Sequence, residues 1–125
     1  MLSPEQITAI AYHALEDKKA KDVKILKTAE HTVLADYFVI CNGSSSAHIK
    51  ALVEEVDKKL SEAGEPPLRR EGLRSDIWVL MDFGSVIVHV FTDEARKFYN
   101  LERLWSDSEQ VDPSTLPMPA LHEAE

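Results

Sequence analysis

The sequence predicts the α/β (α+β) class, with a mixed β-sheet flanked by helices. Two stretches carry apolar residues at helical spacing, and a short, nearly continuous apolar run is typical of a central strand. Two further β-prone runs are separated by a tight connection, which indicates a hairpin. The expected order is helix, strand, strand, helix, an optional short strand, two strands and a final helix.

The first helix is predicted to begin at Pro4. Ser3 can cap this helix, proline suits its first position, and Gln6 can reach back to the cap. The polar run 16–22 ends the helix. Its apolar stripe consists of Ile7, Ile10, Ala11, Ala14 and Leu15.

Two strands are expected next, over residues 23–26 and 37–41. The second reads Tyr-Phe-Val-Ile-Cys, which predicts a strand buried on both faces and therefore central in the sheet. The turn-forming residues 42–46 then supply the cap of a second helix. Gly64 and the two prolines after it end that helix. Its apolar stripe consists of Ile49, Leu52, Val53, Val56 and Leu60.

The predicted hairpin pairs residues 77–81 with residues 86–91. Side chains alternate faces along a strand, so a Phe83-Gly84 loop sorts them into two sets and places Trp78 across from His89. One set is wholly aliphatic and is assigned to the core: Ile77, Val79, Met81, Val86, Val88 and Val90. The other set is mixed: Asp76, Trp78, Leu80, Asp82, Ile87, His89 and Phe91.

This mixed face has two interpretations. Either a helix covers Trp78 inside the monomer, or the face is an exposed aromatic patch that binds another protein. Tryptophan is enriched at interface hot spots, and acidic neighbours favour a basic partner. The faces depend on the loop, because a slip of one residue exchanges them.

A third helix is expected from Thr92 through Tyr99, extending at most to Trp105. Residues 106–125 contain three prolines, five acidic residues and no lysine or arginine. We therefore expect one domain over residues 1–105 and a mostly disordered acidic tail over 106–125.

Composition and charge narrow the class of protein. The chain of 125 residues carries 14 basic and 22 acidic side chains, a net charge of −8, which disfavours nucleic-acid binding and favours a basic protein partner. No apolar run approaches a membrane span, and no secretory signal is visible at the N-terminus. Together with a single cysteine, Cys41, these features predict a reducing, cytoplasmic location.

A search for catalytic groups yields little. The five histidines lack metal-ligand spacing, and we expect neither a metal nor a cofactor. The run Gly43-Ser44-Ser45-Ser46 before a helix could hold an anion, but it lacks the phosphate-loop pattern and its lysine. A strand, Gly-Ser and a helix are also found in nucleotidyltransferases, whose Asp-x-Asp or Asp-x-Glu metal ligands are absent from this sequence. We expect no enzyme, although a nucleotide-handling activity at 43–46 stays open.

Three ordered blocks of sequence carry a family resemblance. They are residues 36–45, DYFVICNGSS; Glu71-Gly72 with residues 78–84, WVLMDFG; and residues 88–91, VHVF, with residues 96–105, RKFYNLERLW. Together they resemble the ribosomal silencing factor family, RsfS, also called Iojap or YbeB. The resemblance covers roughly residues 5–107, and Asn42 stands where serine or threonine is expected.

The resemblance implies a nucleotidyltransferase-like fold without catalytic carboxylates. It also implies binding to the large ribosomal subunit through ribosomal protein fourteen, on the face that meets the small subunit, so that subunit joining is blocked and translation is repressed when nutrients are short. Relatives are also assigned a role in assembly of the large subunit, and dimers are common in the family. A homodimeric assembly factor is therefore an alternative.

Joining the mixed face to this implied function gives a set of expected partner-binding residues. Trp78 would dock on a basic protein surface, flanked by residues of the hairpin and of the third helix. The full set is Asp76, Trp78, Leu80, Asp82, His89, Tyr99, Leu101 and Glu102.

Overall fold

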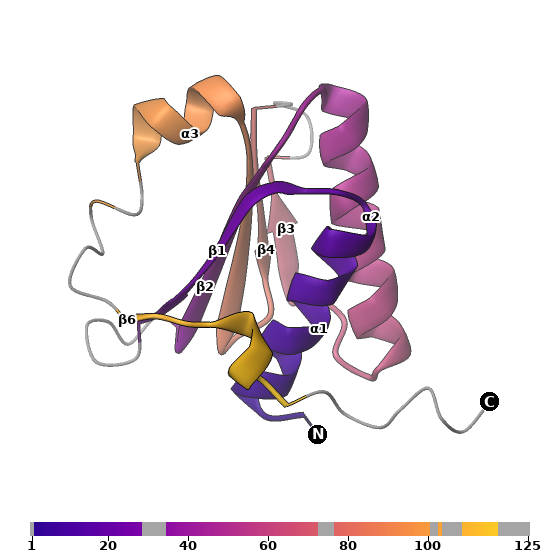
Figure 1. Ribbon diagram of the computed structural model, residues 1–125. Helices are drawn as coiled ribbons and strands as arrows, with labels where there is room; N and C mark the ends of the chain where they lie inside the picture. The colour runs from indigo at the N-terminus through magenta and orange to yellow at the C-terminus, as the bar shows by residue number, and fades with distance from the viewer. Residues whose placement is uncertain (1, 29–34, 73–76, 101–102, 104–108, 118–125) are drawn as a thin grey trace.

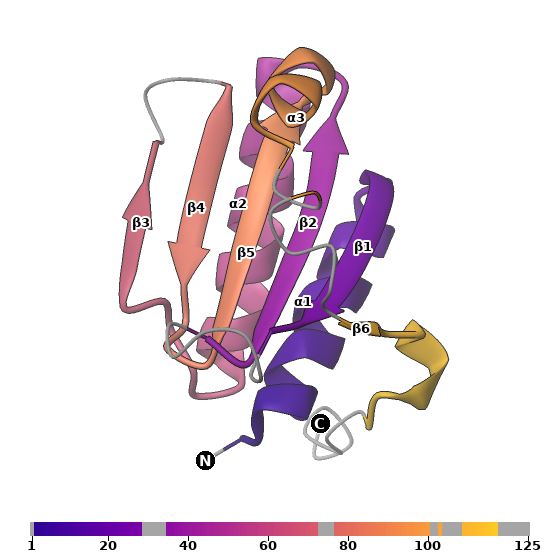
Figure 2. The same ribbon diagram turned by 90° about the vertical axis from the view of Figure 1, so that its left-hand side faces the viewer.

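The protein folds as a six-stranded sheet with two long helices on one face and a short helix at one end of the other face (Figures 1 and 2). This computed structural model describes residues 2–28, 35–72, 77–100, 103 and 109–117. The strand order is β3-β4-β5-β2-β1-β6. The expected mixed sheet with flanking helices is confirmed, because β2 and β5 run parallel and the other neighbouring pairs antiparallel.

The two long helices begin where the sequence predicts. Helix α1 spans Pro4–Asp17, and Ser3 and Gln6 form the expected reciprocal cap. Helix α2 spans Ser46–Glu62 and begins after Ser45, whose side chain accepts a hydrogen bond from the amide of His48. The predicted apolar stripes of both helices are buried against one face of the sheet.

The central strands carry the expected burial. Strand β1 spans Lys21–Lys27, and strand β2 spans Tyr37–Gly43, with all seven of its residues buried. Strand β2 lies between β1 and β5 (Val86–Thr92), which explains its nearly continuous apolar sequence. A register shift between Lys21 and Lys24 marks a bulge in β1, where Asp22 has a φ of 54°.

Strand β4 (Trp78–Asp82) pairs with β5, and the faces of the paired residues are as predicted. The assignment of Ile77 to the core is wrong, because this residue precedes β4 and is 46% exposed. The register of the hairpin is not as predicted, because Trp78 pairs with Phe91, and Leu80 takes the position opposite His89. The loop is Gly84-Ser85 rather than Phe83-Gly84, and Gly84 supplies the positive φ of 86° that the turn needs. This change moves the pairing by two residues, which keeps the side chains of the paired residues on their expected faces.

The optional strand exists as β3, Arg69–Glu71, at the edge beside β4. Helix α3 spans Asp93–Tyr99 and is followed by Asn100 in the left-handed conformation. This seven-residue helix ends at Tyr99, the nearer of the two ends that the sequence allowed. The further end, Trp105, lies outside the described residues.

The prediction of disorder from residue 106 onward is wrong for residues 109–117. Strand β6 (Glu109–Gln110) pairs with β1, and a 3₁₀ turn, η1 (Pro113–Thr115), follows. Val111 and Leu116 pack against the main core, so isolated apolar residues in a polar segment anchor it.

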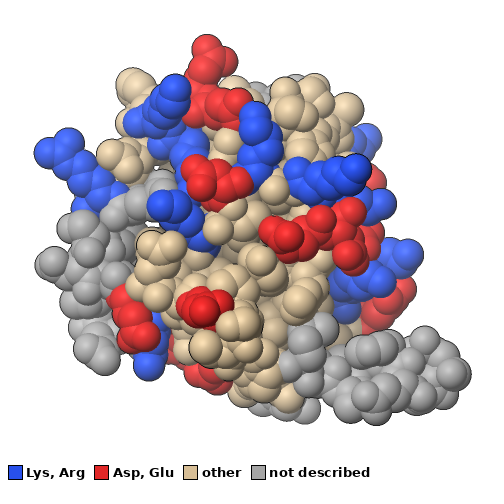
Figure 3. All heavy atoms as spheres, in the orientation of Figure 1, with Lys and Arg blue, Asp and Glu red and all other residues tan. Residues whose placement is uncertain are grey.

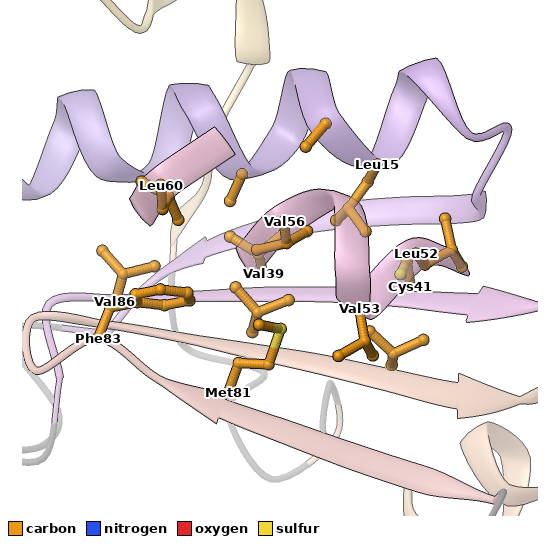
Figure 4. Close-up of a cluster of buried hydrophobic side chains, with 14 of the residues drawn as sticks. Leu15, Val39, Cys41, Leu52, Val53, Val56, Leu60, Met81, Phe83 and Val86 are labelled. Carbon is orange, nitrogen blue, oxygen red and sulfur yellow. The ribbon is translucent and has the colours of Figure 1, made fainter. Parts of the chain in front are cut away.

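The main core lies between the sheet and the helices α1 and α2 (Figure 4). Leu15, Leu52 and Leu60 from the helices meet Val39, Met81 and Val86 from the strands, all with at most 1% of their surface exposed. Burying aliphatic side chains of this size from water supplies the main stabilisation of the fold.

Candidate functional site

The second face of the sheet, turned toward the viewer in Figure 2, is only partly covered by a helix. Helix α3 lies over the upper ends of β5 and β2. Beneath and beside it is a second, smaller hydrophobic cluster that includes Trp78 at its margin. Its buried members are Leu26, Ala35, Phe38, Ile40, Phe91 and Ala95.

Three aromatic side chains, Trp78, Phe98 and Tyr99, form what we call the aromatic patch. The rings of Trp78 and Tyr99 lie 4.6 Å apart, and those of Phe98 and Tyr99 lie 5.1 Å apart. Phe91, fully buried, stacks beneath Trp78 at 5.1 Å. Phe98 is 81% exposed and Tyr99 39% exposed, whereas Trp78 is half-buried. Trp78 is therefore neither fully covered by a helix nor fully exposed. Tyr99 of α3 packs on it, and part of the residue stays accessible.

His89 supports the patch from below. Only 4% of its surface is exposed, so its expected place among residues that contact a partner is wrong. The indole N–H of Trp78 donates to His89 Nδ1 at 3.1 Å, and the Phe38 ring lies 5.0 Å from the imidazole. Burial lowers the pKa of His89 to about 4, so the imidazole is neutral near pH 7 and can accept this hydrogen bond.

Leu80 and Asp82 continue along β4 on the same face, and both are half-buried. The Asp82 carboxylate accepts hydrogen bonds from Arg69 at 3.1 Å and from the amide of Gly84 at 2.8 Å. Asp82 therefore anchors the edge of the hairpin. Three other expected site residues, Asp76, Leu101 and Glu102, lie outside the described residues.

A polar network joins α3 to the ends of β1 and β2. The Arg96 guanidinium, with 8% of its side chain exposed, donates to the Asn42 side-chain oxygen at 2.6 Å and to the carbonyl of Asp22. The Asn42 amide donates to Asp93, which also pairs with Lys21 at 2.9 Å. The hydrogen bonds that Asp93 accepts from Lys21 and Asn42 lower the pKa of its carboxyl group, so this carboxylate stays charged. The network borders a hollow of about 530 Å³.

The polar groups of the run Gly43-Ser44-Ser45-Ser46 form hydrogen bonds within the protein. The amide of Ser44 donates to His48 Nδ1 at 2.9 Å, and His48 Nε2 lies 2.7 Å from the carbonyl of Lys18. Because Ser45 caps α2, the run is a turn and helix cap, as one interpretation of the sequence held.

Neither a thiol nor a metal-binding cluster marks a reaction centre in the described residues. Burial raises the pKa of the Cys41 thiol to about 12, which keeps it protonated. Among the residues that the structure describes, no three His, Cys, Asp or Glu side chains gather closely enough to hold a metal. Within the same residues, no helix has the length and apolar character to cross a bilayer.

Charge is interspersed on the surface drawn in Figure 3. Lysine and arginine side chains alternate with aspartate and glutamate, without a broad area of one sign on that face. Charged side chains also form pairs, including Arg70 with Asp57 at 2.9 Å and Arg69 with Glu71 at 2.5 Å. This surface therefore lacks the continuous basic stripe that nucleic-acid binding uses.

Sequence reasoning missed three residues of this region. Phe98 stands beside the expected Tyr99, and its exposure on a short helix could not be read from periodicity. Arg96 and Asn42 gave no signal, because each is polar and its burial depends on a partner far along the chain.

Comparisons with known proteins agree on one family. Residues 2–125 match the family model described as "Ribosomal silencing factor during starvation". The ribosomal silencing factor RsfS of Halalkalibacterium halodurans is 39% identical over 111 residues, which cover 89% of this chain and 95% of that protein. The RsfS protein of Bacillus subtilis is 38% identical over 111 residues, covering 89% of this chain and 94% of that protein.

A relative in mouse and a solved bacterial structure extend the comparison. The mouse protein named "Mitochondrial assembly of ribosomal large subunit protein 1" is 33% identical over 112 residues, covering 82% of this chain and 49% of that protein. A crystal structure of a Chromobacterium violaceum protein superposes with a TM-score of 0.82 at 34% identity, covering 99% of this chain and all of that one. The chain belongs to the ribosomal silencing factor family, RsfS.

Proposed function

We propose that the protein binds the large ribosomal subunit through ribosomal protein fourteen and thereby blocks joining of the small subunit. The observation that carries this proposal is the aromatic patch, in which Tyr99 packs on the half-buried Trp78 and Phe98, 81% exposed, packs on Tyr99. Aromatic anchors surrounded by polar residues are typical of the centre of a protein–protein interface.

Family membership supports the choice of partner. Bacterial relatives are named ribosomal silencing factors, and the mouse relative's name refers to the ribosomal large subunit. The net charge of −8 favours encounter with a basic protein surface. Leu80 and Asp82 extend the proposed contact along β4. Asp76, Leu101 and Glu102 stay expected contact residues from the sequence.

The proposed mechanism is steric and requires no chemical step. The bound domain occupies the space that the small subunit needs, so subunits cannot join and translation in the cytoplasm falls when nutrients are short. The extent of repression then depends on occupancy, which is set by affinity and by the cellular concentration of the protein. No catalytic group or cofactor takes part.

Pelleting with isolated large subunits through a sucrose cushion tests the binding. Trp78→Ala and Phe98→Ala should each lose co-sedimentation while keeping the circular dichroism of the folded protein. Leu68→Ala, which removes another exposed apolar side chain, 73% exposed, is the matched control and should pellet normally. Folded Trp78→Ala and Phe98→Ala proteins that both pellet like the original would refute the proposed surface.

Subunit joining tests the consequence of binding. Saturating protein added to large subunits before small subunits should reduce the amount of joined ribosome in a sucrose gradient, and Phe98→Ala protein should not. Normal joining at full occupancy would leave binding intact but exclude the steric mechanism.

Assembly of the large subunit by a homodimer is the second candidate. The name of the mouse relative, which refers to that assembly, is the observation that favours it. Cells lacking the protein would then accumulate incomplete large subunits in growing culture, whereas a silencing role predicts a defect only under starvation. Sizing the protein with and without large subunits shows whether a dimer separates on binding.

A further inference from the structure

We propose that Arg96 and Asn42 are positioning residues for the aromatic patch: their contact holds α3 so that Tyr99 packs on Trp78 and Phe98 packs on Tyr99. The inference rests on the proposed function for its binding readout, but its structural part can be tested in the free protein.

Helix α3 cannot fix its own orientation. It has seven residues, and isolated helices shorter than about 12 residues are marginal in water. Only Ala95 and Arg96 of these seven residues are buried. The helix therefore depends on its contacts with the sheet for its position, and the buried arginine supplies the polar part of those contacts.

Asn42 contacts α3 at two points of its first turn. Its side-chain oxygen accepts from Arg96 Nη1 at 2.6 Å, and its amide nitrogen donates to Asp93. Because residues 93 and 96 lie nearly one turn apart on the helix, the two contacts fix both the place of α3 and its rotation about its own axis. Lys21 adds a third tie by pairing with Asp93 at 2.9 Å.

The backbone of β1 is shaped to complete the arginine site. The bulge in β1 leaves Asp22 with a φ of 54°, a conformation unfavourable for most residues and better tolerated by aspartate. The Asp22 carbonyl accepts from Arg96 Nη1, so the bulge and the arginine support each other.

The rotation of α3 decides what the patch presents. Phe98 and Tyr99 follow Arg96 by two and three residues, and a turn of about 100° per residue separates neighbouring side chains. A modest rotation of the helix would therefore carry Tyr99 away from Trp78, from which its ring now lies at 4.6 Å. Phe98 would move with it, since the two rings pack edge to face at 5.1 Å.

Arg96→Met tests the inference, because it keeps the apolar stem and removes the guanidinium. We expect the affinity for isolated large subunits to fall about tenfold or more, with partial recovery in Arg96→Lys, which keeps the charge but not the planar fork. Lys97→Met is the matched control: it removes a cation from the next, exposed position and should change affinity less than twofold. Equal losses in the two methionine variants would show that charge on α3, not positioning, matters.

A double-mutant cycle separates positioning from direct contact. If Arg96 acts only through the patch, Arg96→Met should weaken binding less in a Tyr99→Ala protein than in the original protein, because part of the patch that it positions is already lost. Full additivity of the two changes would overturn the inference.

Fluorescence of the free protein gives a readout independent of the ribosome. The chain has two tryptophans, so Trp105→Phe leaves Trp78 as the sole indole. In that background Arg96→Met should shift the emission to longer wavelength as Tyr99 leaves the indole, and Lys97→Met should not. Asn42→Ala breaks the same contact from β2 and serves if Arg96→Met does not fold. Unchanged emission in a folded Arg96→Met or Asn42→Ala protein would overturn the inference.

Trp78→Ala measured alongside distinguishes the two failures. If it and Phe98→Ala both bind large subunits normally, the proposed binding surface fails, and the emission of Trp78 still decides the positioning. If it loses binding while Arg96→Met binds like the original protein, only the positioning inference fails.

Discussion

The two faces of the sheet are built differently. On the face under α1 and α2, a continuous aliphatic core excludes water, and its largest residues are fully buried. On the other face, six buried residues form a smaller cluster, and aromatic rings extend from it to the surface. The first face can supply stability without contacting anything else, whereas the second leaves apolar surface whose burial requires a partner. The two faces should therefore respond differently to mutation.

The largest effect on stability is expected in the main core. Leu52 of α2 is fully buried against the sheet, so Leu52→Ala should lower the free energy of unfolding by about 2–5 kcal/mol. Urea denaturation measures this loss. Where the variant is folded, it should still pellet with large subunits, and a selective loss of binding there would contradict the division between the faces.

The second face should give the protein a pH dependence through His89. In the unfolded chain this histidine takes up a proton near pH 6.5, whereas burial lowers its pKa to about 4 in the folded protein. Its contribution is therefore complete above pH 6.5 and is lost as the pH falls toward 4, by about 3 kcal/mol in all.

Urea denaturation between pH 7 and pH 4.5 measures this contribution. His89→Gln can still accept from the indole of Trp78 but does not titrate, so its stability should fall less over the same range. An identical pH dependence in the two proteins would assign the effect to other groups.

Two glycines test the connection that leads into β4. Gly72 and Gly64 both have positive φ, at 84° and 87°, but a Cβ on Gly72 would lie 2.0 Å from the carbonyl oxygen of Trp78, whereas one on Gly64 meets nothing within 4 Å. Gly64→Ala should cost about 1 kcal/mol from backbone strain alone. Gly72→Ala should cost about 2–4 kcal/mol, because the backbone at Trp78 must also move. Equal melting temperatures for the two variants would argue against this close approach.

The smallest effect on stability is expected at the exposed end of the patch. Phe98 is 81% exposed, so Phe98→Ala should change the free energy of unfolding by no more than about 0.5 kcal/mol. The same variant is expected to lose binding to large subunits. Thermal denaturation and the pelleting assay should therefore show lost binding with unchanged stability, the reverse of Leu52→Ala. A large loss of stability would instead show that Phe98 supports the fold.

The sequence was sufficient for the features that depend on alternation and periodicity. The faces of the paired hairpin residues followed from parity. The cap at Ser3, and a cap within residues 42–46 that the structure places at Ser45, followed from local chemistry. The register was displaced by two residues, because either Phe83-Gly84 or Gly84-Ser85 can form a tight loop and only the second uses the glycine as its first residue.

Features that depend on distant partners could not be predicted in this way. Strand β6 consists of Glu109 and Gln110, which carry no strand periodicity and are ordered by pairing with β1. The burial of Arg96 depends on Asn42, which lies 54 positions away. The partial exposure of Trp78 likewise depends on where α3 places Tyr99, which no local pattern specifies.

The pairing of β6 with β1 has a consequence for the order in which the chain can fold during synthesis. Strand β1 is made before β6, so its outer edge at Leu26 and Lys27 stays unpaired until Glu109 and Gln110 have been made and have returned to it. The amide of Val111 then donates to the carbonyl of Ile25 at 2.8 Å. A nascent chain therefore carries an open strand edge, a known site of unwanted association, while the residues between β1 and β6 are made, and this edge of the sheet closes only after them.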